Sequence, residues 1–326
     1  MKVALAVLLM VCAASAVGQP IVIGITQIVE HQALNAVRDG IISALAEAGY
    51  VEGENVRYVL ANAQGDFSLA IAIAQEFRAR GVDLVVAIAT PTALAAVQVF
   101  AGTDVPVVYS AVTAPEEYGL TGHPNVTGVS DLIEPALDLA LLKALSPAIR
   151  RVGIVYNPGE ANSDYLTKVA QEAAGGLGLQ IVTAAAESTA MVMLAAQSLI
   201  GRVDAFYATT DNTVAAGIEG VVQVANAERI PFLMADPFSI GRGPLLCAGW
   251  DYYSHGLLTG KVVLDLLTGK RPDQIQLIYQ KDTEFGKREV LLNLDTAQAI
   301  GFTFPQAVLD QATGILIGGR RFVSGE

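Results

Sequence analysis

Hydroxyls and carboxylates stand directly after apolar runs of this sequence, where they could hold a small charged ligand. Thr90 and Thr92 open a helical pattern after a strand-like run, and hydroxyls with backbone N–H groups at a helix start favour a carboxylate. Glu160, Asp211 and Asp251 could neutralise an ammonium group through charge-assisted hydrogen bonds. These residue types indicate a zwitterionic ligand such as an amino acid.

The candidate ligand-binding residues share one kind of position, because each lies just beyond a strand-like run. They are Gln27, Glu30, Thr90, Thr92, Thr113, Asn157, Glu160, Asn162, Asp211, Asn212, Asp251 and Tyr252. Some also have a structural interpretation that the sequence leaves open. Thr90 and Asp211 are suitable helix N-caps, Asn157 suits a turn, and Asp251 with Tyr252 could simply start a helix. A capping residue can also contact a ligand, so the two interpretations are compatible.

Patterns typical of catalysis and metal binding are absent from the sequence. It contains no GxSxG nucleophile elbow and no complete P-loop. His31, His123 and His255 stand far apart, and two cysteines, Cys12 and Cys247, do not provide a metal-binding cluster. We therefore expect a ligand-binding protein with no catalytic residues, no metal and no cofactor.

Alternating strand and helix patterns must position these residues. Short apolar runs predict strands buried on both faces, at residues 21–25, 56–60, 84–88, 105–109, 152–156, 179–184, 205–208, 231–234 and 246–250. Apolar residues at helical spacing predict helices at residues 34–48, 67–80, 90–99, 137–145, 163–175, 189–200, 212–227 and 253–267. Because strands alternate with helices, we expect parallel sheets with right-handed crossovers. Two such series predict an α/β protein with two similar doubly wound lobes.

Composition limits the classes of protein to which this chain can belong. Its 326 residues suggest two domains, and the 52% hydrophobic content is enough for a sizeable core. Lys and Arg total 20 against 32 Asp and Glu, which gives a formal net charge of −12. This acidic balance argues against nucleic acid as a partner, because such binding needs a basic surface.

The N-terminus has the pattern of an export signal. Lys2 supplies a positive charge, residues 3–11 form an apolar run, and residues 14–16 (Ala-Ser-Ala) fit a signal peptidase site. Residues 1–16 are therefore expected to be removed, leaving a periplasmic protein. A lipid anchor on Cys12 is the less favoured alternative, because the preceding Val11 is larger than lipidation sites normally accept.

Several strings of residues together resemble a known family. The sequence is similar to the substrate-binding proteins of ABC transporters, in the tryptophan/tyrosine-type group with the type I periplasmic-binding-protein fold. The strings that carry this resemblance are residues 28–31, 87–91, 125–130, 156–163, 210–213 and 251–253, and residues 156–163 are the most specific.

The resemblance implies two lobes, joined by a three-segment hinge, that close on an amino acid, often an aromatic one, and deliver it to a membrane permease. Carried over by motif, Thr90 and Thr92 would bind the carboxylate of the ligand. Asp211 and Asp251 would bind its ammonium group. The second lobe's side of the cleft would be lined by Asn157, Glu160 and Asn162.

The expected domain organisation follows from these lobes. Residues 17–112 with 251–272 form the N-terminal lobe, residues 113–250 with 273–305 form the C-terminal lobe, and residues 306–326 form a tail without an assigned role. The protein is expected to be a monomer whose partners are a small-molecule ligand, an amino acid, and an ABC permease in the membrane. The sequence leaves one alternative open, an extracytoplasmic sensor or binding protein for a branched amino acid or a sugar.

Overall fold

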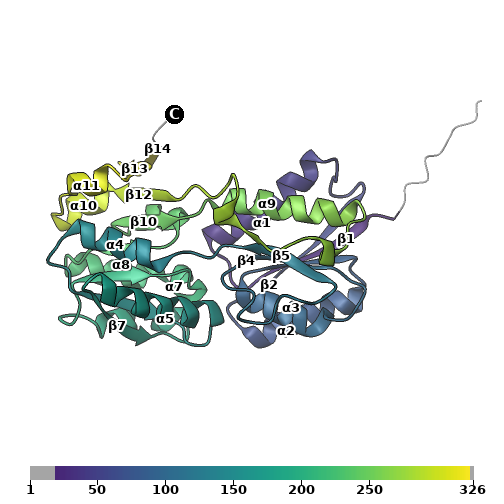
Figure 1. Cartoon of the computed structure of the whole chain (residues 1–326), viewed down its shortest axis with the longest axis horizontal. Helices are drawn as coiled ribbons and strands as arrows, with labels where there is room; N and C mark the ends of the chain where they lie inside the picture. The colour runs from purple at the N-terminus through teal and green to yellow at the C-terminus, as the bar shows by residue number, and fades with distance from the viewer. Residues whose placement is uncertain (1–18, 324–326) are drawn as a thin grey trace, which may run out of the picture.

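The computed structural model describes residues 19–323, which form two α/β lobes lying side by side (Figure 1). The expected export signal at residues 1–16 and the alternative anchor Cys12 lie outside the described residues. Each lobe contains one sheet with helices on both faces. The expected architecture of two doubly wound lobes is therefore confirmed.

The first lobe contains a six-stranded parallel sheet in the order β11-β5-β4-β3-β1-β2. Its strands are β1 (Ile21–Gln27), β2 (Val56–Asn62), β3 (Leu84–Ile88), β4 (Val107–Val112), β5 (Val126–Ser130) and β11 (Ile278–Tyr279). Its helices are α1 (Gln32–Glu47), α2 (Phe67–Arg80), α3 (Thr90–Phe100) and α9 (Tyr252–Leu267), with a short 3-10 helix η3 (Pro272–Gln274). Helices α1 and α9 cover one face of the sheet, and α2 and α3 cover the other (Figure 1).

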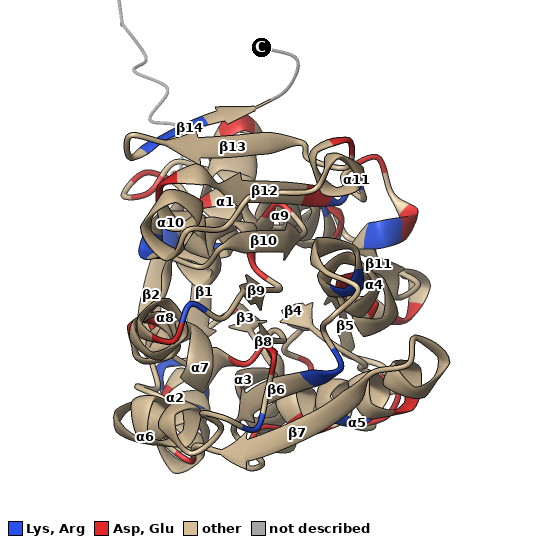
Figure 2. Cartoon of the chain, turned by 90° about the vertical axis from the view of Figure 1, so that its left-hand side faces the viewer, with Lys and Arg blue, Asp and Glu red and all other residues tan. Residues whose placement is uncertain are grey.

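The second lobe contains an eight-stranded sheet in the order β14-β13-β12-β10-β9-β8-β6-β7, which Figure 2 shows from top to bottom. Its strands are β6 (Arg151–Tyr156), β7 (Gln180–Ala185), β8 (Ala205–Ala208), β9 (Phe232–Met234), β10 (Leu246–Gly249), β12 (Glu289–Asn293), β13 (Gly314–Ile317) and β14 (Arg320–Val323). Strand β12 is antiparallel to β10, and β14 is antiparallel to β13.

The helices of the second lobe also lie on both faces of its sheet. They are α4 (Pro135–Leu145), α5 (Ala161–Gly176), α6 (Val192–Gln197), α7 (Asn212–Ala216), α8 (Ile218–Ala227), α10 (Leu294–Ile300) and α11 (Gln306–Leu309), with the 3-10 helices η1 (Thr189–Met191) and η2 (Pro237–Arg242). In Figure 2, α4, α5 and α11 lie on one side, and α6, α7, α8 and α10 lie on the other. Acidic and basic residues are scattered over the elements of this lobe (Figure 2).

Within residues 19–323 the chain passes between the lobes three times. The first crossing (131–134) joins β5 to α4, the second (250–251) joins β10 to α9, and the third (280–288) joins β11 to β12 and includes the 3-10 helix η4 (Gln280–Asp282). The three-segment hinge implied by the family resemblance is therefore present.

Two elements correct the expected division of the chain. Strand β5 lies in the sheet of the first lobe, because residues 126–128 and 130 pair with β4, although residues 113–250 were assigned to the second lobe. The strand was missed because Thr127 and Gly128 interrupt its apolar run. A glycine is required there, since a Cβ atom at position 128 would lie 2.2 Å from the carbonyl oxygen of Tyr109. Strand β11 also lies in the first sheet, although residues 273–305 were assigned to the second lobe.

The C-terminal segment is also part of the fold. Residues 306–326 were expected to be a tail without a role, but β13 pairs with β12 and β14 forms the edge of the second sheet. Their pairing extends the sheet of the second lobe by two strands. No helix in the described part of the chain is long and apolar enough to cross a membrane.

Helix α9 is held unusually close to α1 by two glycines. A Cβ atom at Gly40 would lie 2.3 Å from the carbonyl oxygen of Tyr253, and one at Gly256 would lie 2.2 Å from that of Val37. Larger residues at either position would force the helices apart. This contact fixes the first turn of α9, which begins directly after the second crossing.

Candidate ligand-binding site between the lobes

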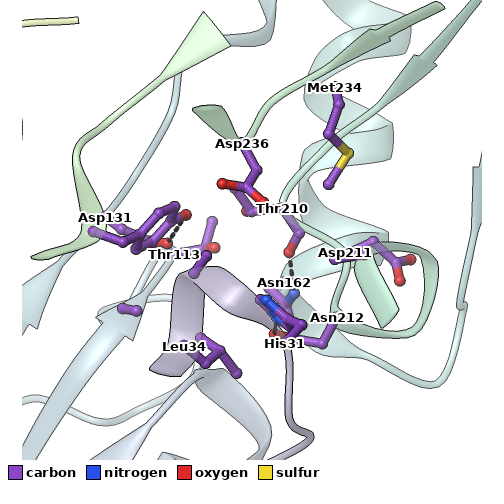
Figure 3. A pocket seen from close by; sticks show the side chains of 14 residues that line it. His31, Leu34, Thr113, Asp131, Asn162, Thr210, Asp211, Asn212, Met234 and Asp236 are labelled. Atoms are coloured by element: carbon purple, nitrogen blue, oxygen red, sulfur yellow. Dashed lines mark hydrogen bonds between the residues drawn. The ribbon is translucent and has the colours of Figure 1, made fainter. Parts of the chain in front are cut away.

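A pocket lies between the carboxyl ends of the two sheets, where an α/β fold places its ligands (Figure 3). The space between its lining atoms, counted together with the open solvent at its mouth, is about 360 Å³. Both lobes and the first crossing contribute to its lining, which consists of His31, Ala33, Leu34, Ala111, Thr113, Asp131, Asn162, Thr210, Asp211, Asn212, Ala215, Met234, Asp236 and Tyr252. The pocket therefore combines an apolar surface with several carboxylates and amides.

Asp131 contributes a buried oxygen that has no donor. The residue directly follows β5, and its Oδ2 accepts a hydrogen bond of 2.9 Å from the Tyr252 hydroxyl (Figure 3). Its Oδ1 is buried and has no hydrogen-bond partner within residues 19–323. Burial raises the pKa of Asp131 to about 6, because the ionised form loses its hydration. A cationic group bound at Oδ1 would satisfy both the charge and the missing hydrogen bond.

Two polar atoms on the second lobe also lack partners. Asn162 donates from Nδ2 to the carbonyl oxygen of Thr210 at 2.8 Å (Figure 3). Its Oδ1 and the Thr210 hydroxyl are buried and make no hydrogen bond to other described residues. Buried polar atoms are normally paired, so these atoms mark a place where a polar ligand would complete the hydrogen bonding.

Asp211 does not have the free carboxylate that an ammonium site requires. It is the N-cap of α7 and accepts from the Val214 N–H at 2.7 Å. Its Oδ2 accepts from the Asn157 N–H at 2.6 Å and from the Ser163 hydroxyl at 2.5 Å. Figure 3 shows this carboxylate pointing away from Thr210 and Asp236. The geometry therefore gives no support to the expectation that Asp211 binds an ammonium group, because the hydrogen bonds that its carboxylate accepts come from its own lobe.

Glu160 is occupied in the same way. Its Oε2 accepts from the backbone and side-chain N–H groups of Asn212 at 3.2 and 2.6 Å. Its Oε1 accepts from the backbone N–H and the hydroxyl of Thr213 at 2.9 and 2.6 Å. Glu160 thus caps the start of α7. Burial and the nearby Glu160 carboxylate raise the pKa of Asp211 to about 7.

Asn157 and Asn212 belong to the same network. Asn157 donates from Nδ2 to the Thr213 hydroxyl at 2.9 Å, and its Oδ1 accepts from the Gly159 N–H at 2.9 Å. Asn157 and Glu160 line a wider outer cleft between the lobes, whereas Asn212 lines the inner pocket. The second lobe's side of the cleft thus contains Asn157, Glu160 and Asn162, as expected, but most of their polar atoms hold that wall together.

Threonines of the first lobe differ in their access to the pocket. Thr92 donates its hydroxyl to the carbonyl oxygens of Ile88 and Ala89, so the hydroxyl is used in joining α3 to the end of β3. Thr90 lies outside the pocket lining, and its Oγ1 accepts from the Thr113 N–H at 3.4 Å. Thr113 itself lines the pocket. The geometry therefore gives no support to the expectation that the Thr92 hydroxyl binds the carboxylate of the ligand.

Three further expected residues lie away from the inner pocket. Asp251 caps α9 through the Ser254 N–H at 2.9 Å and is absent from the pocket lining, so the geometry gives no support to its expected ammonium role. Gln27 donates to Val29 and Asn35, and together with Glu30 it lines a separate surface hollow. The structure thus brings five expected residues into the pocket: Thr113, Asn162, Asp211, Asn212 and Tyr252.

The lobes are in direct contact across the cleft. The Tyr118 hydroxyl donates to the carbonyl oxygen of Ala161 at 2.6 Å, and His31 Nε2 lies 3.5 Å from Asn212 Oδ1. Burial lowers the pKa of His31 to about 4, so this histidine is neutral near pH 7. These contacts describe a closed arrangement of the lobes.

Sequence reasoning missed Asp131, Asp236, Thr210 and His31 as pocket residues. Asp236 is buried and accepts from the Phe238 N–H at 2.9 Å and from the Ser239 hydroxyl at 2.6 Å, so it caps η2. Asp131 would have followed from the strand-end rule had β5 been recognised, since it comes directly after Ser130. The position of Asp131 in the sequence was informative, but β5 was not recognised as a strand.

Two α/β lobes, three crossings and a buried polar pocket between the lobes define a bilobal ligand-binding protein of the periplasmic-binding-protein class. The chain belongs to the family of ABC transporter substrate binding proteins, whose family model matches residues 22–316. Members of this family bind small-molecule ligands, work with ABC permeases and are typically extracytoplasmic. The protein is a ligand binder and not an enzyme.

Individual relatives agree with this assignment. A tyrosine-binding protein from Clostridioides difficile (strain R20291) is 34% identical over 283 residues, which cover 85% of this chain and 80% of the relative. A solved ABC domain from Streptococcus pneumonia in complex with L-Trp is 30% identical, with a TM-score of 0.84 over 91% of this chain and 100% of that structure. Solved leucine- and sugar-binding proteins at 20% identity or less share the type I fold alone.

A third comparison is informative about the arrangement of the lobes. The ligand-free, open structure of a substrate-binding protein with adhesive properties from Clostridium difficile is 32% identical and covers 87% of this chain and 96% of that structure. Its TM-score of 0.64 is lower than that of the L-Trp complex, although the two identities are nearly equal. The present structure is thus more similar to the complex than to the open form.

Proposed function

We propose that this protein is the extracytoplasmic receptor of an ABC importer, which captures an aromatic amino acid between its lobes and delivers it to the permease. The observation that carries the proposal is the buried, unpartnered Oδ1 of Asp131, which lies in the pocket between the lobes. An ammonium group is the part of an amino acid that such an oxygen would bind.

The chemistry of the lining supports one orientation of the ligand. Its ammonium group contacts Asp131 and the free Oδ1 of Asn162. Of the described residues that line the pocket, none is Lys or Arg, so the carboxylate is held by neutral donors, for which the hydroxyls of Thr113 and Thr210 are the candidates. Because Asp131 adjoins the hinge and Asn162 lies on the second lobe, the ammonium group would tie the lobes together.

The apolar part of the lining supports an aromatic side chain. Leu34 and Met234 supply apolar contacts from opposite lobes. Tyr252 supplies a ring, which Phe238 supports edge-on at 6.4 Å between centroids. The tyrosine-binding relative and the relative bound to L-Trp support the same side-chain class.

Closure of the lobes follows from contacts that only a bound ligand makes with both of them. A ligand can shift the balance between open and closed forms only by its difference in affinity for the two. The proposed ligand contacts Asp131 and Asn162 together only in the closed form. In this proposal the closed monomer is the form recognised by the permease, and residues 1–16 direct export.

A ligand panel tests the proposal directly. Residues 17–326 would be purified, freed of carried-over ligand by unfolding and refolding, and then melted with each of the twenty amino acids and a set of sugars. A ligand that binds only the folded protein raises its melting temperature, and calorimetry then gives the dissociation constant. We expect stabilisation by tyrosine, tryptophan or phenylalanine. Stabilisation by sugars alone, or by none of the panel, would contradict the proposal.

Delivery to a permease requires a second measurement in cells. Deleting the gene should abolish uptake of the labelled amino acid at low external concentration, and the wild-type gene should restore it. A gene that carries Asp131→Asn should not restore this uptake. Normal uptake in the deletion strain would contradict the transport role but would leave the binding result intact.

A further inference from the structure

A chain of buried side chains connects the ligand pocket to the hinge. Its centre is His255, in the first turn of α9, which is fully buried. One ring nitrogen, Nε2, lies 2.8 Å from the backbone nitrogen of Ala111, and the other, Nδ1, lies 2.8 Å from Oε1 of Gln280. Ala111 lines the pocket, whereas Gln280 lies in the third crossing.

The hydrogen bonds fix the state of this histidine. A backbone N–H can only donate, so Nε2 must be the acceptor and the proton must be on Nδ1, which donates to Gln280. This arrangement requires a neutral imidazole. Burial lowers the pKa of His255 to about 4, which agrees with the neutral form.

The backbone at Ala111 explains why its N–H is available. The register between β4 and β5 shifts between Tyr109 and Val112, which is a β-bulge. Ala111 has a φ of +53°, a left-handed conformation that residues with a Cβ rarely adopt. The bulge displaces Ala111 from the regular ladder and turns it toward the pocket, and His255 accepts the N–H that it exposes.

Gln280 carries the connection onward to two crossings. Its Nε2 donates to the carbonyl oxygen of Asp251 at 3.1 Å, in the second crossing, and to that of Phe285 at 3.1 Å, in the third. Both polar ends of this buried side chain are therefore occupied. The first crossing joins the same helix turn, because Tyr252 donates its hydroxyl to Asp131. All three crossings thus meet the first turn of α9.

We propose that His255 is a positioning residue. It fixes the position of the pocket backbone at Ala111 relative to the hinge, which it contacts through Gln280, so that ligand contact and lobe closure are coupled. The inference rests on the proposed function, because it assumes that a ligand closes the lobes. His255 touches no ligand in this scheme. It acts through the Ala111 N–H on one side and through Gln280 on the other.

Three substitutions, two at His255 and one at Gln280, separate the two ends of the connection. His255→Gln places an amide oxygen near Nε2, which keeps an acceptor for Ala111 but removes the donor to Gln280. His255→Asn places an amide nitrogen near Nδ1, which keeps the donor to Gln280 but leaves the Ala111 N–H without an acceptor. Gln280→Met removes the hinge end and leaves His255 intact. His123→Gln, at a histidine whose side chain bonds only to Gly119 among the described residues, is the matched control.

The single tryptophan of the sequence, Trp250, reports closure because it lies in the second crossing, with its Nε1 donating to the carbonyl oxygen of Asp131. Stopped-flow mixing with tyrosine would follow its emission, excited where tyrosine does not absorb. We expect His255→Asn to weaken tyrosine binding about tenfold, the effect of one buried unsatisfied N–H. We expect His255→Gln and Gln280→Met to slow the concentration-independent closing phase about tenfold and to leave the encounter rate unchanged.

The opposite result is a purely structural role. If all three variants melt at lower temperature but bind and close within about twofold of the His123→Gln control, the proposal is overturned. Should the His255 variants fail to fold, Gln280→Met decides alone, since a normal closing rate in that variant removes the hinge end of the connection.

Hydrogen exchange of the ligand-free protein separates this inference from the proposed function. His255→Asn should raise exchange in residues 109–113, and Gln280→Met should raise it in residues 249–252 and 280–286. A wild-type protein that binds no amino acid would defeat the proposed function, while this exchange pattern would still support the connection. A uniform increase over the whole chain would overturn the connection, whatever the ligand.

Discussion

The two walls of the pocket use their carboxylates differently. On the second lobe, Asp211 and Glu160 accept hydrogen bonds from α7 and its neighbours, and these bonds hold the wall together. At the first crossing, Asp131 accepts one hydrogen bond from Tyr252, and its other oxygen has no donor among residues 19–323. The difference teaches that the number of acidic residues near a cleft does not identify the ligand contact. The identifying property is a buried acceptor that the protein itself leaves unpaired.

The largest expected effect is the loss of binding on Asp131→Asn. An ammonium group left in the pocket without its counter-charge costs about 4 kcal/mol, so the dissociation constant for tyrosine should rise roughly 1,000-fold. The melting temperature should change little, because asparagine still accepts from Tyr252. Calorimetry of Asp131→Asn beside Asp236→Asn makes the comparison, since both oxygens of Asp236 already accept hydrogen bonds. Equal losses in the two variants would remove the special position of Asp131.

Asp211→Ala should show the opposite balance, with a larger effect on stability than on binding. It removes the cap of α7 and the bonds from Asn157 and Ser163, and the free energy of unfolding should fall by about 3 kcal/mol. Tyrosine affinity, measured where the variant remains folded, should fall less than about tenfold. Denaturant titration and calorimetry on the same sample give both values. A stable variant that no longer binds would reverse the roles assigned to the two walls.

The pH dependence of binding gives an intermediate effect. Burial raises the pKa of Asp131 from 3.8 to about 6, so below that pH the carboxyl is protonated and cannot neutralise an ammonium group. Tyrosine affinity should therefore fall about tenfold between about pH 7 and pH 5. Calorimetry at several pH values tests this, and Asp131→Asn should bind weakly without that pH dependence. A flat profile in the wild type would argue against a charge on Asp131.

Stability should follow the opposite trend with pH. Because the folded-state pKa of Asp131 lies above the ordinary value, its contribution to stability is fully present below about pH 4 and is lost as the pH rises through about 6. Asp211, with a pKa raised to about 7, contributes with the same sign. Denaturation of the ligand-free protein across this range measures the sum. The Asp131 part should disappear in Asp131→Asn, and the Asp211 part should remain.

The smallest effect is expected for Asp251→Asn. Asp251 caps α9 and lies outside the pocket lining, and asparagine is an equally suitable cap. Tyrosine affinity should stay within about twofold, and the free energy of unfolding within about 0.5 kcal/mol. Calorimetry and denaturation check both values. A large loss of binding would return Asp251 to the site.

Much of the fold could be predicted from apolar periodicity. The alternation of buried runs with helical patterns gave both lobes, because parallel strands covered on two faces must be apolar along their whole length. Strand β5 was not predicted, because Thr127 and Gly128 break that rule. Gly128 leaves room for the carbonyl oxygen of Tyr109. Strands β13 and β14 were not predicted, because they lie at the edge of the sheet, where exposed residues such as Arg320 and Arg321 are tolerated.

The site was predictable in place but not in detail. The strand-end rule led to Thr113, Asn162 and Tyr252, which line the pocket. It could not distinguish Asp131 from Asp211, because that distinction depends on whether donors such as Ser163 and the Asn157 N–H have folded against the carboxylate. Hydrogen bonds between distant segments are set by tertiary packing, and spacing along one sequence does not reveal them.

The interleaved path of the chain has a consequence for its synthesis. The first sheet is incomplete until residues 278–279 add β11, and the second is incomplete until residues 314–323 add β13 and β14. During synthesis, neither sheet can therefore be completed before these later segments have been made. Removing the final ten described residues should therefore affect the whole second lobe, and not merely trim its end.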